Sequence, residues 1–129
     1  MIVTTDIANI LFVECKKLGI QVVPMGQTVI GELKGERITI HAKSQQDGTY
    51  WKKGFVEVNI CVPDLRSGEA NTIRLSEVER QAVSTLGDVV GEHDGSAYRY
   101  SISQIGIEKD ADLRCHYVNV KLLFQVLNC

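Results

Sequence analysis

Apolar residues recur at helical spacing in two stretches of this 129-residue chain. The first stretch predicts a helix that is capped by Thr4 or Thr5 and ends at Gly19, with an apolar stripe made of Ile7, Ile10, Leu11, Cys15 and Leu18. Cys15 lies on this stripe and is therefore expected to be a small buried apolar residue. Residues 20–35 mix short β-prone runs with proline and glycine, which indicates a loop with one short strand.

The second helical stretch covers residues 72–90. Its apolar stripe comprises Leu75, Val78, Ala82, Leu86 and either Val89 or Val90. Ser76 and Glu79 match a capping box, whereas Asn71 or Thr72 would begin the helix one turn earlier. The sequence leaves both starting points open.

Four other stretches alternate between apolar and polar residues, which is the period of a β-strand. Residues 36–43 and 55–62 are expected to form a long antiparallel hairpin, and residues 97–107 and 114–127 a second pair of strands. The core faces of the first, second and last strands are expected to carry Ile38, Ile40 and Ala42; Val56, Val58, Ile60 and Val62; and Val118, Val120, Leu122, Phe124 and Val126.

The third of these strands has a break in its alternation. Its apolar parity changes after Ile102, so that Ile105 and Ile107 would fall on the wrong face. One extra residue in the strand would restore the pattern. The sequence therefore predicts a β-bulge near Gln104 and Gly106.

The order of elements is helix, loop, hairpin, helix, hairpin. It predicts an α+β fold with a mostly antiparallel sheet of about four to five strands and two helices packed on one face. No linker or change of composition divides residues 1–129, so we expect a single domain.

The composition is that of an ordinary globular protein, with 44% hydrophobic and 23% charged residues. The net charge of −2 argues against a nucleic-acid platform, which needs clustered Lys and Arg, so nucleic acid is not expected as a partner. No apolar run approaches the roughly 18 residues of a membrane span. The N-terminus has no basic leader and carries Asp6 and Glu14, so we expect a cytoplasmic protein with four free thiols.

The sequence shows no catalytic or metal-binding constellation. Cys115 and His116 are neighbours on a predicted strand and should point to opposite sides, which prevents them from ligating one metal. The positions of His41, His93 and Cys61 in the sequence give no reason to expect these three residues to meet. The segment GEHDG around His93 is typical of a solvated turn. We therefore expect no metal, no cofactor and no enzymatic activity.

The segment DGTYWKKG is the most suggestive surface feature. It places Tyr50 and Trp51 beside Lys52 and Lys53, at the expected tip of the first hairpin. Such a tip could stack on nucleotides, anchor a contact with another protein, or pack back onto the edge of the domain.

The chain resembles small phage tail-completion proteins, also called tail terminators or neck proteins. The resemblance follows the order of elements: an N-terminal helix, an irregular segment, the hairpin ERITIHAK and GFVEVNICVPD, the turn RSGEAN before a helix, and the closing run CHYVNVKLLFQV. It implies a homo-oligomer, usually a hexameric ring, that caps the tail tube and later meets the head connector. It also implies synthesis in the host cytoplasm followed by incorporation into the virion.

This resemblance makes the expected function structural and non-enzymatic. Candidate contact residues, chosen by location, are Tyr50, Trp51, Lys52, Lys53, Tyr117, Asn119 and Leu123. The alternative is a small cytoplasmic α+β module that binds nucleic acid or a small ligand at the tip made by residues 50–53.

Overall fold

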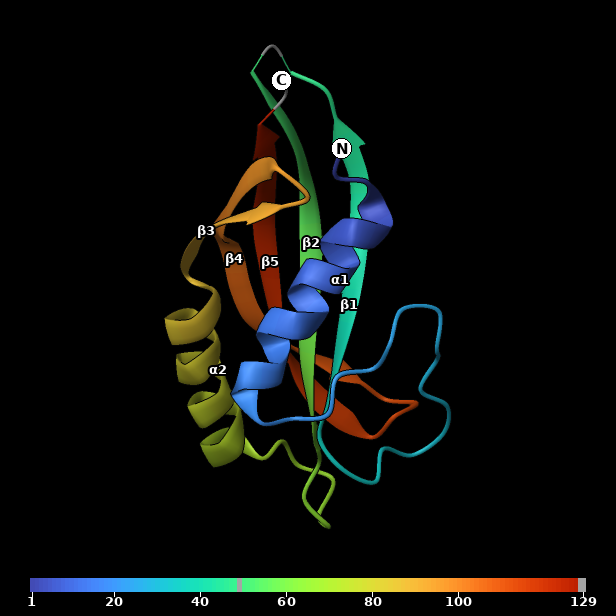
Figure 1. Cartoon of the computed structure of the whole chain (residues 1–129). Helices are drawn as coiled ribbons and strands as arrows, with labels where there is room; N and C mark the ends of the chain where they lie inside the picture. The colour runs from blue at the N-terminus through green and yellow to red at the C-terminus, as the bar shows by residue number, and fades with distance from the viewer. Residues whose placement is uncertain (49, 128–129) are drawn as a thin grey trace.

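The computed structural model describes residues 1–48 and 50–127. Five antiparallel strands form one sheet in the order β1-β2-β5-β4-β3: β1 (Arg37–Gln46), β2 (Trp51–Pro63), β3 (Asp88–His93), β4 (Ser96–Asp110) and β5 (Cys115–Leu127). Two helices, α1 (Thr4–Cys15) and α2 (Thr72–Leu86), lie on one face of this sheet (Figure 1). The predicted α+β class is confirmed.

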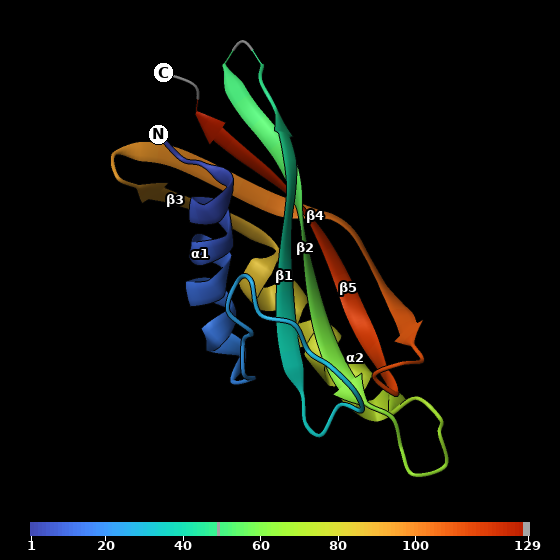
Figure 2. The same ribbon diagram turned by 90° about the vertical axis from the view of Figure 1, so that its right-hand side faces the viewer.

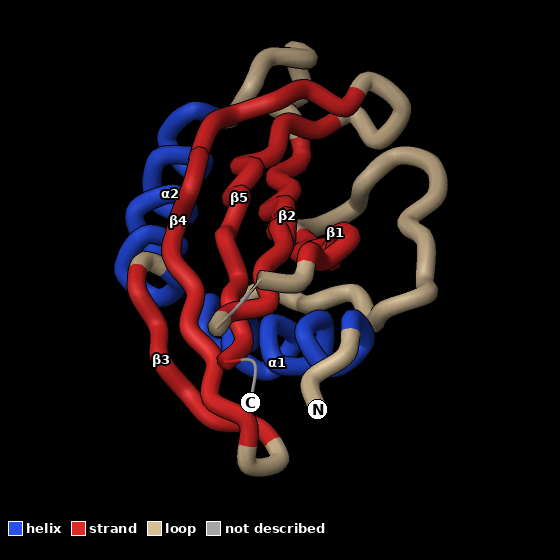
Figure 3. Tube along the Cα trace, turned by 90° about the horizontal axis from the view of Figure 1, so that it is seen from above, coloured by secondary structure: helices blue, strands red, loops and turns tan. Residues whose placement is uncertain are grey.

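The core lies between the sheet and the two helices. The apolar residues that alternate along β2 and β5 are almost fully buried, and Val58, Ile60, Val120 and Leu122 have no exposed surface. They pack against the helix stripe of Leu75, Val78, Ala82 and Leu86. The strands twist strongly, so that α1 and α2 cover different parts of the same face (Figure 2, Figure 3).

Helix α1 has the predicted apolar stripe but a different start. Its N-cap is Val3, and Asp6 replaces the expected threonine cap by accepting a 2.9 Å hydrogen bond from the Val3 N–H. After α1, a short 3₁₀ turn (Lys16–Leu18) ends at Gly19, whose φ of 73° is the left-handed conformation that favours glycine.

Helix α2 begins at the earlier of the two possible starts. The Asn71 side chain caps it by accepting a hydrogen bond from the Arg74 N–H at 3.3 Å, so the capping box of Ser76 and Glu79 is not used. The helix is also shorter than predicted, because it ends at Leu86.

Asn71→Ala is expected to lower the free energy of unfolding by about 1 kcal/mol, because the first turn of α2 loses the acceptor for one of its free N–H groups. Ser76→Ala is the matched control: Ser76 is exposed inside the helix, and alanine should be neutral or slightly stabilising there. Urea unfolding of both variants measures the difference. A larger loss in Ser76→Ala would contradict the observed cap.

Residues 88–93, predicted as helix and solvated turn, instead form strand β3. Val89 continues the apolar pattern of α2 because it packs against the same core from the strand. A tight turn at Asp94 and Gly95, with φ of 49° and 81°, joins β3 to β4. An Asp-Gly pair with positive φ at both positions is the commonest two-residue hairpin turn, and it was the local signal for this strand.

The first hairpin is longer than expected. Strand β1 extends to Gln46 and β2 begins at Trp51, so the polar connection shrinks to residues 47–50. Trp51, Lys52 and Lys53 therefore belong to β2 and pair with β5. Pairing between β1 and β2 ends at Gln46 and Lys53, so Trp51 and Lys52 lie at the end of the first hairpin.

Residues 20–36 form an irregular loop without a named strand. The backbone of its first part pairs with the outer edge of β1: the Val23 N–H donates to the Ile38 carbonyl at 2.8 Å, and the Ile38 N–H donates to the Gln21 carbonyl at 2.9 Å. Farther on, the Leu33 N–H donates to the Leu113 carbonyl at 2.9 Å, which ties the loop to the turn after β4.

The predicted β-bulge is confirmed. The register between β4 and β5 shifts between Ile102 and Gln104, and this shift lets Ile105 face the core like the residues before it. None of the helices in the described part of the chain is long and apolar enough to cross a membrane.

Candidate functional site

Most of the candidate functional side chains lie on the face of the sheet opposite the helices. We call it the open face. It carries the odd-numbered residues of β2 and β5, which the register sets side by side, as in the pairs Phe55 with Leu123 and Asn59 with Asn119. Strand β4 adds Arg99, which is paired with Gln125.

Two cations lie over aromatic rings on one half of the open face. The Arg99 guanidinium lies 4.3 Å from the centre of the Trp51 ring, and the Lys121 ammonium lies 4.3 Å from that of Phe55. Arg99 is further fixed by the hydrogen bond that its Nε donates to Gln125 at 2.9 Å. These contacts hold long side chains in place before any partner arrives, which lowers the entropy cost of binding.

Apolar side chains surround these pairs. Phe55 is 38% exposed and Val90 on β3 is 79% exposed, while Leu123 is half-buried. We call this group the aromatic patch: Trp51, Phe55, Val90, Arg99, Lys121 and Leu123. Trp, Arg and Phe beside aliphatic residues are typical of the centre of a protein interface.

The middle of the open face is polar. Asn119 donates a 2.7 Å hydrogen bond to the Asn59 side chain, and Lys43 lies 3.4 Å from the Glu57 carboxylate. Tyr117 donates a 2.6 Å hydrogen bond to Glu108, which raises the pKa of Tyr117 to about 12. These side chains form hydrogen bonds and an ion pair with one another, which holds the polar middle of the open face in a fixed arrangement.

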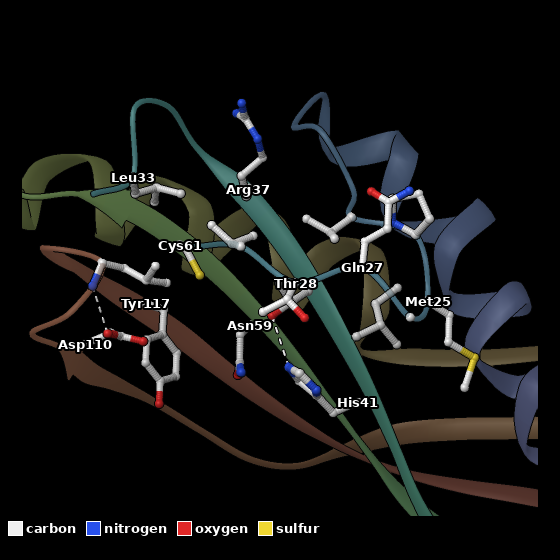
Figure 4. A pocket seen from close by; sticks show the side chains of 17 residues that line it. Met25, Gln27, Thr28, Leu33, Arg37, His41, Asn59, Cys61, Asp110 and Tyr117 are labelled. Atoms are coloured by element: carbon white, nitrogen blue, oxygen red, sulfur yellow. Dashed lines mark hydrogen bonds between the residues drawn. The ribbon is translucent and has the colours of Figure 1, made fainter. Parts of the chain in front are cut away.

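The loop of residues 20–36 lies over the other end of the open face and borders an open pocket of about 300 Å³ (Figure 4). Its walls come from the loop and from open-face residues of β1, β2 and β5, including His41, Asn59 and Tyr117. Beneath the loop, Leu33 packs on Cys61 and Cys115, and the three form a small second core.

The three cysteines of the described residues are buried free thiols, as expected for Cys15, and Cys129 lies outside the described residues. Cys61 and Cys115 share a hydrogen bond across the strands, a proximity that the sequence did not predict. Burial raises the pKa of Cys61 to about 11 and those of Cys15 and Cys115 to about 12. At neutral pH all three remain protonated thiols, which are poor nucleophiles.

Folding stability is expected to fall as the pH rises above 9. Unfolded thiols release their protons near pH 9, whereas the folded ones hold theirs until about pH 11 to 12, so alkali favours the unfolded chain. Urea unfolding between pH 7.5 and 10.5 measures the effect. Cys15→Ala, which removes one of these groups, should show a shallower dependence on pH, and a stability that rises with pH would contradict the assignment.

The structure places the predicted contact residues in three positions. Five lie on the open face, with Trp51, Lys53 and Leu123 toward one end and Tyr117 and Asn119 toward the other. Lys52 points to the opposite face, where it is paired with Val126, and Tyr50 lies in the connection with 73% of its surface exposed. Arg99 covers the Trp51 ring, so Trp51 is partly engaged within its own chain.

Two histidines lie close to carboxylates. His116 lies 2.7 Å from Asp64, and the His93 Nε2 lies 3.7 Å from both Asp6 and Asp94. As predicted, Cys115 and His116 point to opposite sides of β5. No group of three or more possible metal ligands occurs within residues 1–48 and 50–127.

Sequence reasoning missed four of the six residues of the aromatic patch. Phe55 has the same strand parity as Trp51 and Lys53, and this signal could have found it. Lys121 likewise has the parity of Asn119 and Leu123 on the last strand. Arg99 and Val90 join the patch only through the pairing of β4 with β5 and of β3 with β4, which parity alone does not provide.

The chain matches no protein-family model, and no curated protein is significantly similar to it in sequence. Its functional assignment therefore rests on the fold and on the surfaces described above.

Proposed function

We propose that this protein is a non-enzymatic assembly subunit of a phage or prophage tail. In this proposal it joins copies of itself into a ring, usually hexameric in the family it resembles, that caps the tail tube and connects it to the head. It is made in the host cytoplasm and ends in the virion. The α+β fold agrees with the order of elements on which the resemblance rests.

The aromatic patch on the open face is the observation that carries the proposal. A β-sheet with one face packed on helices and an aromatic, Arg-containing patch on the other has a surface suited to docking. Trp51 and Phe55 supply area, while Arg99 and Lys121 are already held over the two rings. Such anchors contribute most of the binding energy in protein interfaces.

A ring needs two different surfaces on each subunit, one of which meets the other on the neighbouring copy. The aromatic patch is one. The helix layer offers the second, because Val13 on α1 is 63% exposed and Val83 on α2 is 49% exposed. Two unlike surfaces on opposite sides of the molecule suit a head-to-tail contact.

The alternative function, binding of nucleic acid or a small ligand at residues 50–53, has less support. The Trp51 ring, on which a base would stack, already carries the Arg99 guanidinium. The net charge of −2 gives no general attraction for a polyanion. A small ligand would be better accommodated in the pocket beneath the loop than at these residues.

Sequencing the DNA for several kilobases on each side of the gene tests the proposal. Neighbouring genes for capsid, connector and tail-tube proteins are the expected result. Neighbours devoted to metabolism or gene regulation would overturn the proposal, and ligand binding in the pocket would then become the leading hypothesis.

A further inference from the structure

Strand β4 has a long open edge. Strand β3 pairs with it only as far as Ser101, whereas β5 accompanies it to Asp110. Within the described parts of the chain, no strand lies on the other side of residues 102–110. Figure 2 shows the end of β4 at the rim of the sheet. Unpaired backbone groups along such an edge are a template for another strand.

The opposite edge of the sheet, formed by β1, contacts other parts of the chain. At the start of β1, the loop backbone satisfies Ile38 on both its N–H and its carbonyl. The Gln45 side chain, near the end of β1, donates to the Thr4 hydroxyl of α1 at 3.4 Å. The chain therefore uses its own residues at the β1 edge and, within its described parts, places no strand along residues 102–110 of β4.

The open edge carries a nearly palindromic segment, Gln-Ile-Gly-Ile-Glu, centred on Gly106. Ile105 and Ile107 are paired with Val120 and Val118 and so point to the helix side of the sheet. Ile107 remains 49% exposed there. Flanking them on the open face are Gln104 and Glu108, which are paired with Lys121 and Tyr117.

We propose that two copies of this chain pair antiparallel through residues 102–110, about a twofold axis at Gly106, and form one continuous sheet. In this register Ile105 of each copy faces Ile107 of the other, and Gln104 faces Glu108. The apolar pair covers the exposed Ile107, and the Gln104 amide can donate to the Glu108 carboxylate.

Gly106 suits a position on the axis. A Cβ built there meets no atom of its own chain within 4 Å, so the surface above it is open. Glycine inside a strand commonly marks a place where another backbone approaches closely. Twofold contacts of this self-complementary kind are the commonest in homo-oligomers.

This pairing does not rest on the proposed function. It joins identical surfaces, whereas the ring joins unlike ones, and it uses the β4 edge rather than the aromatic patch. A dimer can therefore form in the free protein whether or not the ring proposal holds.

Sedimentation velocity of the purified chain tests the dimer. The expected mass is twice the 14.3 kDa of one chain at micromolar concentration. Ile107→Glu should weaken dimerisation roughly a hundredfold or more, because it places a carboxylate against Ile105 of the partner copy and sets the two introduced carboxylates diagonally across the axis. Ile73→Glu is the matched control, since Ile73 is 77% exposed on α2 away from the edge, and it should leave the dimer intact.

Cysteine cross-linking tests the register, in chains that also carry Cys129→Ser. Gly106→Cys should form an intermolecular disulfide under mild oxidation, because residues on the axis lie within disulfide range of each other. Gln104→Cys should not, because the two copies of that position are about 13 Å apart. A monomeric wild-type chain, a dimer that survives Ile107→Glu, or cross-linking at position 104 in place of 106 would each overturn the proposal.

Discussion

Leu122→Ala is expected to lower the free energy of unfolding by about 2–5 kcal/mol, whereas Leu123→Ala should cost about 1 kcal/mol or less. The two leucines are neighbours on β5, so the substitutions remove the same atoms from the same strand. Leu122 is fully buried between sheet and helices, and its truncation leaves a cavity in the core. Leu123 lies half-buried on the open face, where water can replace the lost side chain.

Equilibrium unfolding in urea, followed by circular dichroism, measures both values. The difference between the variants tests the register of the central strand, since a shift of one residue would exchange the two faces. Equal losses, or a larger loss for Leu123→Ala, would show that the helices cover the other face of the sheet.

Replacing both Trp51 and Phe55 with alanine is expected to abolish ring assembly while the subunit stays folded. The double variant removes the two rings of the aromatic patch and releases Arg99 and Lys121 from their fixed positions. Truncation of a central aromatic anchor commonly lowers the binding free energy by about 2 kcal/mol or more. Loss of both rings should therefore weaken each contact between subunits about a thousandfold.

Tyr50→Ala is the control for this experiment. Tyr50 is an exposed aromatic residue next to the patch in sequence, but it lies in the connection and not on the open face. Mass photometry of concentrated protein compares the three chains, and circular dichroism checks their folding. Loss of assembly in Tyr50→Ala, with assembly retained in the double variant, would move the contact from the open face to the connection.

Much of this fold was predictable because its central strands alternate strictly. The core faces of β2 and β5 and the bulge in β4 follow from parity alone. Strand β3 was missed because Val89 continues the helical stripe of α2, and a helix and a strand that bury the same core leave a similar local pattern. The pairing of the loop with Ile38 depends on tertiary contacts that no local pattern encodes.

The candidate site was only partly predictable for a related reason. Strand parity placed Tyr117, Asn119 and Leu123 on one face, but it did not reveal that Trp51 and Lys53 belong to the same surface. Trp51 and Lys53 could be placed on this face only when the start of β2 and its register with β5 were known. The contact between Cys61 and Cys115 likewise arises from the pairing of two strands that lie far apart in the sequence.

Electron microscopy of headless tails mixed with the purified protein tests the central claim most directly. Tails should come from host cells in which the gene is deleted, so that their ends are free. The account predicts a closed ring at one end of the tube with the wild-type chain, and bare ends with the chain that lacks Trp51 and Phe55. Bare tube ends at saturating concentrations of folded wild-type protein would contradict it.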